Sequence, residues 1–399
     1  MFGLHLVKLS ELRCLKEVEL PEVLSSIRRI LSRGGVEETV AVGPDGSTVV
    51  ANHSVFKALE WLGVSYVPTS SGSPERTYVP IEALGFFDNL ETSRYRVFGD
   101  TEELLYRNWP TPLVRLRNSS ISGRTAWAKL ESYNPWSASI KDRVGWYMFK
   151  KLSEKLGAPP RLIYEATSTN TGLALAAVCS IHGSKFRAYL PHTAAAGESL
   201  LRVFGAEVVI SPKPLTVDII SEVRSAASSN GAFNPNQFEN DANFEVHLKY
   251  TAKELELQMR EAGILPKAIF GGLGTSGHMS AIALYFKSRF SGIKVYGAVP
   301  KLGESIRGIR RIETGMKWIQ YVELDGVVDV SLKEAARSVV EIARRDGILV
   351  GLSSGAVYYA YRTMVEAGQL DEGDYVLVFP DAGFKYVDTL VRYLAETAE

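Results

Sequence analysis

The chain has 399 residues, enough for two or three domains with a sizeable core. Its 45 lysine and arginine residues balance its 45 aspartate and glutamate residues, so no overall field favours a nucleic acid, an anionic membrane or a polyanionic partner. A small-molecule substrate fits this balance better.

The cysteines and histidines argue against a disulfide-stabilised protein and against a metalloprotein. Cys14 and Cys179 are far apart in sequence, which predicts neither a disulfide framework nor a metal site. The six histidines lack HxxxH or HxH spacing, so we expect no bound metal. The N-terminus lacks a basic stretch followed by a long apolar one, and nowhere do about 18 uncharged apolar residues run together. We expect a soluble, cytoplasmic protein.

In chain order, residues 1–105 are predicted to form a separate small α+β domain. The pattern indicates a strand at the start, a helix over 21–32 and a hairpin around Asp45 and Gly46. A polar stretch at 70–77 indicates a loop or a domain boundary.

From about Leu113 onward, short β-branched or aromatic runs alternate with segments of helical period, which is typical of a parallel sheet covered by helices. We therefore predict an α/β fold, with strands over 161–167, 185–191, 207–212, 267–274, 294–300 and 375–381. The predicted helices include 172–182, 244–259, 279–289 and 332–345. Sites in such sheets gather at the carboxyl ends of strands, so we expect one at the turns after Thr167, Gly274 and Asp381.

The segment AKLESYNPWSASIKDR (128–143) places Lys141 after a serine-rich turn and near a predicted helix N-terminus. There the helix dipole disfavours an ammonium, which helps a lysine to act as an amine nucleophile toward an aldehyde. The alternative is a solvated lysine beside Asp142 and Arg143.

Three further loops have two interpretations each. TSTNTG (167–172) is either a cradle for a carboxylate or phosphate or an ordinary helix N-cap. GGLGTSGH (271–278) is either a phosphate loop or a tight turn, and it lacks the Gly-Lys-Ser/Thr of a P-loop. GLSSG (351–355) offers Ser353 either as a cap or as a partner for a ring nitrogen.

Taken in order, these segments resemble the fold-type-II pyridoxal-phosphate (PLP) family that includes cysteine synthase, cystathionine β-synthase and threonine synthase. The pattern is most similar to cysteine synthase and covers nearly everything after about residue 110. The matching runs are TPLVRL (111–116), NPWSASIKDR (134–143), TSTNTG (167–172), LLRVFGAEVV (200–209), QFEN (237–240), GGLGTSGH (271–278), GILVGLSSGA (347–356) and PDAGFKY (380–386). The resemblance implies two doubly wound α/β domains of the tryptophan-synthase-β type, which we place at 106–255 and 256–399, and a homodimer.

The family implies roles for the matching positions. Lys141 would bind PLP as a Schiff base and then take the Cα proton of the substrate. Asn170 would contact the phenolic oxygen and Ser353 the pyridine nitrogen. The phosphate would be held by Gly272, Gly274, Thr275, Ser276, Gly277 and His278. The substrate would be held by Thr167, Ser168, Thr169, Thr171, Gln237 and Phe238. A β-leaving group would depart to give an aminoacrylate, to which sulfide would add to give L-cysteine.

The sequence departs from the family at three places. Thr169 replaces the glycine of the usual TSGNTG, and His278 adds an imidazole near the phosphate loop. The segment IRGIRRIETG (306–315) carries Arg307, Arg310 and Arg311 where the family is neutral. Guanidinium groups bind phosphate bidentately, so we expect O-phospho-L-serine as substrate rather than O-acetyl-L-serine, with Arg311 as its contact.

Several alternatives remain open. The arginines could form a basic helix face paired with Glu304 and Glu313. O-acetylserine sulfhydrylase, cystathionine β-synthase and threonine synthase activities are rival functions, and so is a catalytically silent scaffold. The layout is most similar to that of the archaeal O-phosphoserine sulfhydrylases, which carry extra N-terminal sequence before the PLP domain, and this resemblance supports O-phospho-L-serine over the rival substrates.

The N-terminal extension is itself similar to the ParB and free-serine-kinase superfamily. The hallmark of that superfamily is Asp-Gly-His-His-Arg, and these positions here read Ala51, Asn52, His53, Ser54 and Val55. Because most of the polar hallmark is gone, we expect a structural or dimerisation role rather than a nucleotide site.

Overall fold

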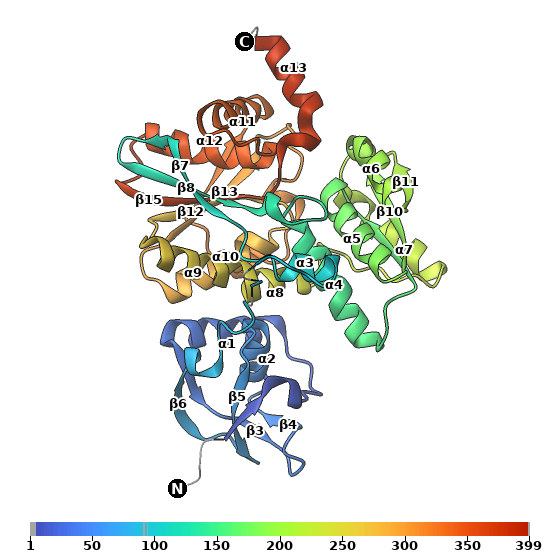
Figure 1. Cartoon of the computed structure of the whole chain (residues 1–399). Coiled ribbons are helices and arrows are strands. Elements are labelled where there is room, and N and C mark those ends of the chain that lie inside the picture. Colours follow the sequence, from blue (N-terminus) through green and yellow to red (C-terminus); the bar gives the residue numbers. More distant parts are fainter. Residues whose placement is uncertain (1–4, 91, 94, 398–399) are drawn as a thin grey trace.

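The computed structural model describes residues 5–90, 92–93 and 95–397, and it confirms an α/β protein built around several sheets. Figure 1 shows three units: a blue N-terminal unit, a green unit around a three-stranded sheet, and a larger unit that contains the C-terminal helices. None of the described helices is both long and apolar enough to cross a membrane.

The N-terminal unit combines a four-stranded sheet, a two-stranded sheet and two helices. The four-stranded sheet has the order β1 (His5–Lys8), β5 (Tyr66–Ser71), β3 (Val40–Val42) and β4 (Val49–Ala51). The other elements are α1 (Leu20–Arg33), β2 (Gly35–Glu38), α2 (His53–Leu62) and β6 (Arg76–Pro80).

The predicted helix and hairpin of this unit are confirmed. The β3–β4 turn forms at Gly46, whose positive φ of 70° suits a residue without a side chain. The carboxylate of Asp45 accepts hydrogen bonds from the backbone N–H of Ser47 and Thr48. The predicted loop at 70–77 is the connection between β5 and β6.

The second unit has a three-stranded parallel sheet with α5 packed on its central strand. Its strands are β9 (Leu162–Ala166), β10 (Lys185–Pro191) and β11 (Glu207–Ser211), with β10 in the middle. Its helices are α4 (Lys141–Leu156), α5 (Thr169–Ile181), α6 (Glu198–Val203) and α7 (Ile220–Ser229).

The third unit has a six-stranded sheet in which only the edge strand β7 is antiparallel. The order is β14 (Gly326–Val330), β13 (Lys294–Pro300), β12 (Ala268–Gly272), β15 (Gly373–Phe379), β8 (Arg124–Leu130) and β7 (Leu113–Ile121). Its helices are α10 (Gly277–Arg289), α11 (Leu332–Asp346), α12 (Leu352–Glu366) and α13 (Val387–Thr397). Below the sheet in Figure 1 lie α8 (Ala242–Val246) and α9 (Ala252–Ala262), which a π-helical turn at His247–Thr251 joins.

This sheet corrects the predicted domain boundaries. The prediction of a smaller domain over 106–255 assigned β7 and β8 to it, but β8 pairs with β15 from Gly373↔Arg124 to Phe379↔Leu130. An apolar strand must satisfy its backbone hydrogen bonds at an available sheet edge, and here that edge lies almost 250 residues away in sequence. The short helix α3 (Thr101–Tyr106) also differs from the prediction, since it packs on α4 and α5 rather than within the N-terminal unit.

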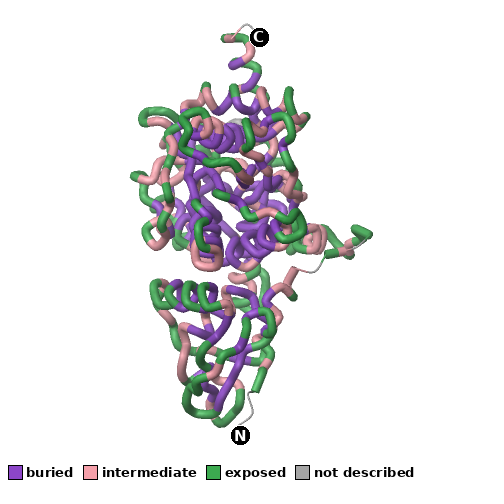
Figure 2. Tube along the Cα trace, turned by 90° about the vertical axis from the view of Figure 1, so that its left-hand side faces the viewer, coloured by how far each residue is buried: buried purple, intermediate pink, exposed green. Residues whose placement is uncertain are grey.

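The N-terminal unit is packed onto the rest of the chain through α1 and α2. One continuous apolar core includes Ile27 and Leu59 of these helices together with Ile282 of α10, and Figure 2 shows buried residues on both sides of the junction. Within it the buried side-chain nitrogen of Lys253 lies within hydrogen-bonding distance of the backbone oxygens of Leu62 and Phe86 and of Oδ1 of Asn89. Burial holds the pKa of Lys253 well below its usual value.

Candidate active site

The loop before α4 is folded so that Lys141 is the first residue of the helix. The carboxylate of Asp142 accepts hydrogen bonds from the backbone N–H of Trp136 (2.7 Å) and Ser137 (2.9 Å), which folds the serine-rich turn back onto the helix. Ile140 N–H donates to the carbonyl of Pro380 at 2.8 Å, so the loop is also attached to the end of β15. These contacts explain why a Ser-rich turn and an aspartate flank the lysine.

Lys141 projects into a cavity whose surroundings disfavour a charged amine. Burial lowers the pKa of Lys141 to about 8, and the carboxylate of Asp381 opposes part of that shift. An appreciable fraction of the side chain is therefore a neutral amine near neutral pH.

The N-terminal turn of α5 forms one wall of this cavity with Ser168, Thr169 and Asn170. Behind it, the hydroxyl of Thr171 donates to Oε1 of Gln237 at 2.7 Å, and Gln237 Nε2 donates to the carbonyl of Ala166. This arrangement attaches the end of β9 to the segment of Gln237.

Thr169, the residue that departs from the family pattern, is accommodated by a glycine. A Cβ on Gly197 would lie 2.3 Å from Oγ1 of Thr169. The hydroxyl therefore occupies space that any other residue at 197 would need.

The turn between β12 and α10 forms a second wall, with Gly274 and Thr275 on the cavity. A Cβ on Gly274 would lie 2.6 Å from the carbonyl oxygen of Gly308, and Ser276 is held at a positive φ of 71°. Strained or glycine-dependent backbone at the start of a helix of this length is typical of an anion cradle.

Two buried polar atoms at this turn lack partners among the described residues. They are the hydroxyl of Ser276 and Oδ1 of Asn243, whose Nδ2 donates to Thr275 Oγ1 at 2.9 Å. The Ser276 hydroxyl is an unpaired donor beside a helix N-terminus and fits a phosphate group, whereas Oδ1 of Asn243 is an acceptor and is not a contact for one.

His278 is buried in the first turn of α10 and its two ring nitrogens have no hydrogen-bond partner in the described chain. Burial, together with the charge of Lys141, lowers the pKa of His278 to about 3. Its ring lies 5.8 Å from that of His247. The added imidazole is thus neutral at physiological pH and brings no charge to the loop.

The predicted site residues fall into three groups. Lining the cavity of about 370 Å³ are Lys141, Ser168, Thr169, Asn170, Gln237, Phe238, Gly274 and Thr275. Adjoining it in sequence, but not on its surface, are Thr167, Thr171, Gly272, Ser276, Gly277, His278 and Ser353. Of the adjoining group, Ser353 lies in the first turn of α12, and a Cβ on Gly308 would lie 3.6 Å from its hydroxyl.

Arg311 stands apart from both groups, which corrects its expected placement. Its guanidinium pairs with Asp329 at 2.6 Å and Glu313 at 2.9 Å and does not reach the cavity. For this residue the alternative of a cation paired with Glu313 is right. Residues 306–311 form a turn, with Gly308 at φ 94°, and a short 3-10 helix follows at Ile312–Thr314. Arg307 and Arg310 of this turn line the cavity instead.

The charge of the cavity wall is one-sided. Among the described residues its lining contains no aspartate or glutamate and five basic side chains, which are Lys141, Arg307, Arg310, Lys385 and Arg392. Lys385, Tyr386 and Arg392 were missed as site residues. The predicted turn after Asp381 was the available signal for the first two, whereas Arg392 lies on α13, where no local pattern marks it.

Arg310 is fixed in this wall. Its Nε donates to the carbonyl of Gly274 at 2.8 Å and its guanidinium lies over the ring of Phe238. Burial lowers the pKa of Arg310 to about 10, with Glu239 as the opposing charge. A desolvated cation in such a wall favours an anionic ligand.

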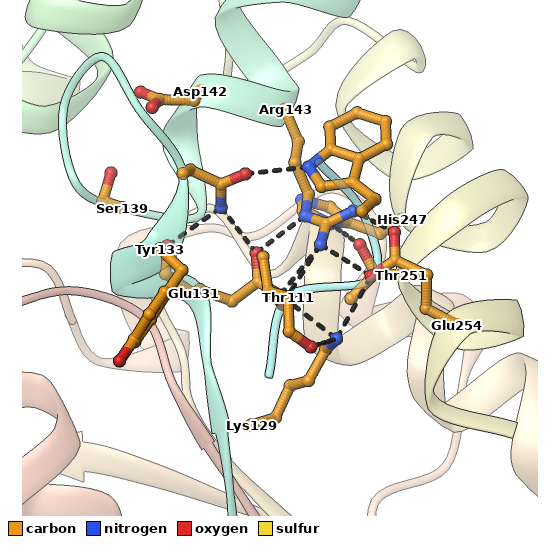
Figure 3. A network of polar contacts seen from close by, with 12 residues as sticks. Thr111, Lys129, Glu131, Tyr133, Ser139, Asp142, Arg143, His247, Thr251 and Glu254 are labelled. Atoms are coloured by element: carbon orange, nitrogen blue, oxygen red, sulfur yellow. Dashed lines mark hydrogen bonds and ion pairs between the residues drawn. The ribbon is translucent and has the colours of Figure 1, made fainter. Parts of the chain in front are cut away.

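Beneath Lys141, a fully buried network of charges fixes α4 to its neighbours (Figure 3). Arg143 pairs with Glu131 after β8 at 2.7 Å and with Glu254 of α9 at 2.6 Å, and Lys129 pairs with Glu254 at 3.1 Å. Two cations and two anions compensate one another, and the Arg143 guanidinium also stacks 4.3 Å from the ring of Trp109. The network fixes the first turn of the helix that begins with Lys141.

Comparison with known proteins agrees with this site. Residues 104–381 match the family described as pyridoxal-phosphate dependent enzyme. A curated cysteine synthase of Staphylococcus aureus (strain N315) is 32% identical over 294 residues, which cover 70% of this chain and 93% of that protein.

Solved structures with the same fold are also similar. An O-acetylserine dependent cystathionine beta-synthase from Helicobacter pylori is 28% identical with a TM-score of 0.65, covering 73% of this chain and 98% of that one. A hydrogen sulfide-producing enzyme from Fusobacterium nucleatum is 26% identical with a TM-score of 0.64, over the same shares of each chain.

The fold and the matched segment define a pyridoxal-phosphate-dependent enzyme of fold type II, and the chain belongs to that family. Within the family it is a relative of cysteine synthase and cystathionine β-synthase. Its cofactor is pyridoxal 5′-phosphate.

Proposed function

We propose that the enzyme is a cysteine synthase that uses O-phospho-L-serine. In this reaction the Cβ–O bond breaks, phosphate leaves with the bonding electrons, and the sulfur of sulfide forms the new bond to Cβ. The observation that carries the proposal is the cavity wall, which has no acidic side chain among the described residues and carries three arginines, Arg307, Arg310 and Arg392, besides Lys141 and Lys385. Such a wall suits a dianionic leaving group better than a neutral ester. The proposal extends to a homodimer and to a structural role for the N-terminal unit.

When bound, PLP delocalises the electrons released at the Cα of the substrate. In the proposed assignment Lys141 holds the cofactor and exchanges the Cα proton through its amine. Thr171 and Gln237 support the turn of Ser168 and Thr169, whose hydroxyls and N–H groups bind the substrate carboxylate. The phosphate of the cofactor is held at the N-terminus of α10.

The proposed phosphate contact of the substrate is now Arg307 rather than Arg311. Within the described chain Arg307 makes no hydrogen bond or ion pair, and it lines the cavity. Arg310 supports it but is engaged by Gly274, so Arg307 is the better residue to test.

Arg307→Ala is expected to lower kcat/KM for O-phosphoserine about 10- to 100-fold, because one charge-assisted contact to a phosphate is worth about 1.5–3 kcal/mol. Turnover of O-acetylserine should change little. The turnover of both substrates is measured as the cysteine formed from sulfide.

Arg311→Ala is the matched control, since the guanidinium of Arg311 is paired with Asp329 and Glu313, and this variant should behave like the parent. Equal use of the two substrates, unaffected by Arg307→Ala, would contradict the proposal, and homocysteine in place of sulfide distinguishes cystathionine β-synthase activity.

The pKa of Lys141 predicts a pH dependence of cofactor loading. The neutral amine attacks the aldehyde, and its fraction rises about tenfold per pH unit below a pKa of about 8, then levels off. We expect the loading rate of cofactor-free protein, followed by visible absorption after rapid mixing with PLP, to show a midpoint near pH 8. A midpoint near 10.5, the value of an unshifted lysine, would show that burial does not act on this amine.

A further inference from the structure

A second lysine of the cavity wall makes contacts that bear on Asn170. The ammonium of Lys385 donates to Oδ1 of Asn170 and, at 2.7 Å, to the carbonyl of Ser137, and it lies 3.5 Å from Oδ2 of Asp381. An ammonium has three donor hydrogens and no acceptor; here two of them form hydrogen bonds, and the carboxylate of Asp381 adds an ion pair. Its side chain is 13% exposed, which leaves it little freedom to move elsewhere.

These contacts determine which way round the Asn170 amide lies. Its Oδ1 faces Lys385, which can only donate, and its Nδ2 donates at 2.8 Å to Oδ2 of Asp381, a carboxylate that accepts. Rotation of the amide by 180° would set nitrogen against ammonium and oxygen against carboxylate. Asn170 therefore has its carbonyl engaged, and the side of the amide that can face a ligand is its donor Nδ2, which also lies near the Tyr386 hydroxyl.

Asp381 is itself held in place. Its Oδ2 accepts a hydrogen bond from the hydroxyl of Tyr386, and its backbone oxygen accepts one from the N–H of Gly351 at the start of α12. The side chain is 1% exposed. The asparagine amide is thus held between two fixed groups, one a cation and the other an anion.

The same lysine joins three segments of the site. Ser137 belongs to the loop that carries Lys141, Asn170 to the first turn of α5, and Lys385 to the turn before α13. Lys385 comes from the third unit and α5 from the second, so this ammonium adds a polar contact between the two units to the packing of α4 on α5.

We propose that Lys385 is a positioning residue, which locks the Asn170 amide so that it presents only a hydrogen-bond donor to the cofactor. The proposal rests on the assignment of Asn170 as a contact of the cofactor's phenolic oxygen. In its anionic form the phenolic oxygen only accepts hydrogen bonds, so a fixed N–H donor favours that form. Because the amide is already fixed, binding does not carry the entropic cost of ordering a free amide.

The test measures cofactor binding without substrate. Lys385→Met removes the donor and keeps most of the side-chain volume. We expect it to raise the dissociation constant of PLP about tenfold, the effect of losing one well-placed hydrogen bond, and to shift the visible absorption maximum of the bound cofactor. Lys385→Arg retains a cation that only donates, and its dissociation constant should stay within about threefold of the parent. Lys301→Met, an exposed lysine paired with Glu334 and outside the cavity lining, is the control and should not change binding.

A double-mutant cycle with Asn170→Ala decides whether Lys385 acts through the asparagine. If it does, Lys385→Met adds less than about twofold in the dissociation constant on an Asn170→Ala background. If the two substitutions act independently, so that their fold-changes in the dissociation constant multiply, the proposal is overturned. Unchanged binding and absorption in Lys385→Met would overturn it as well. A loss of binding that tracks a lowered melting temperature, also seen for Lys385→Arg, would assign the lysine to folding instead. Because no substrate is present, failure to use O-phosphoserine would leave this result unaffected.

Discussion

Replacing Lys141 with alanine is expected to abolish the visible absorption band of the cofactor-bound protein and to lower turnover by about 10²–10⁴-fold or more. The reason is that one amine is assigned both the attachment of the cofactor and the Cα proton. A catalytically silent scaffold predicts no turnover in the parent protein and no effect of this change.

The matched control for this prediction is Lys150→Ala, an exposed lysine on the same helix whose ammonium lies over the ring of Trp146. It should retain both absorption and turnover. Retained absorption in Lys141→Ala, with the cofactor covalently attached elsewhere, would move the assignment to another lysine of the cavity, and Lys385 is the obvious one to examine.

Arg143→Met is expected to lower the free energy of unfolding by about 3–5 kcal/mol, measured by chemical denaturation. The change leaves Glu131 and Glu254 buried with only Lys129 to compensate them. Arg33→Met removes an exposed arginine 3.8 Å from Glu37 and should cost no more than about 1 kcal/mol.

A second variant separates lost charge balance from lost packing. Arg143→Met combined with Glu254→Gln removes one cation and one anion, and should recover part of the loss because Lys129 and Glu131 remain as a balanced pair. If Arg143→Met and Arg33→Met have the same free energy of unfolding, the network does not contribute to stability.

The ion pairs also predict that the protein is sensitive to acid. The charges of Arg143 and Lys129 lower the pKa of Glu131 to about 2. The contribution of Glu131 to the free energy of unfolding is therefore present above its unfolded pKa of about 4.3 and is lost as the pH falls toward 2.

The local sequence predicted the helices and strands of the α/β part well. The strand over 185–191 has those bounds in the structure, where Phe186 and the apolar residues after Arg187 are buried between two polar turns. The helix predicted over 244–259 is found as α8 and α9 with a π-helical turn between them, a distortion that hydrophobic periodicity does not reveal. The pairing of β8 with β15 could not be predicted locally, since strand partners are chosen across the whole sheet.

The site shows the same division. The motifs at strand ends predicted that Lys141, Asn170 and Gly274 lie in one site, and all three line the same cavity. The prediction works because the carboxyl ends of parallel strands meet at one edge of the sheet. The direction of an arginine in an irregular turn follows no period, so residue spacing could not separate Arg307 from Arg311. The role of Lys385 depends on a network of three segments that only the folded chain assembles.

The buried amine of Lys253 has a consequence for how this enzyme can be shortened. Two of its hydrogen-bond partners are the carbonyls of Leu62 and Phe86, so the N-terminal unit satisfies a buried polar group that belongs to α9. A chain that began near residue 105 would keep the cavity-lining residues but leave this amine without those partners and an apolar helix face uncovered. The N-terminal unit is therefore part of the same apolar core as the rest of the chain, and removing it is expected to expose that core.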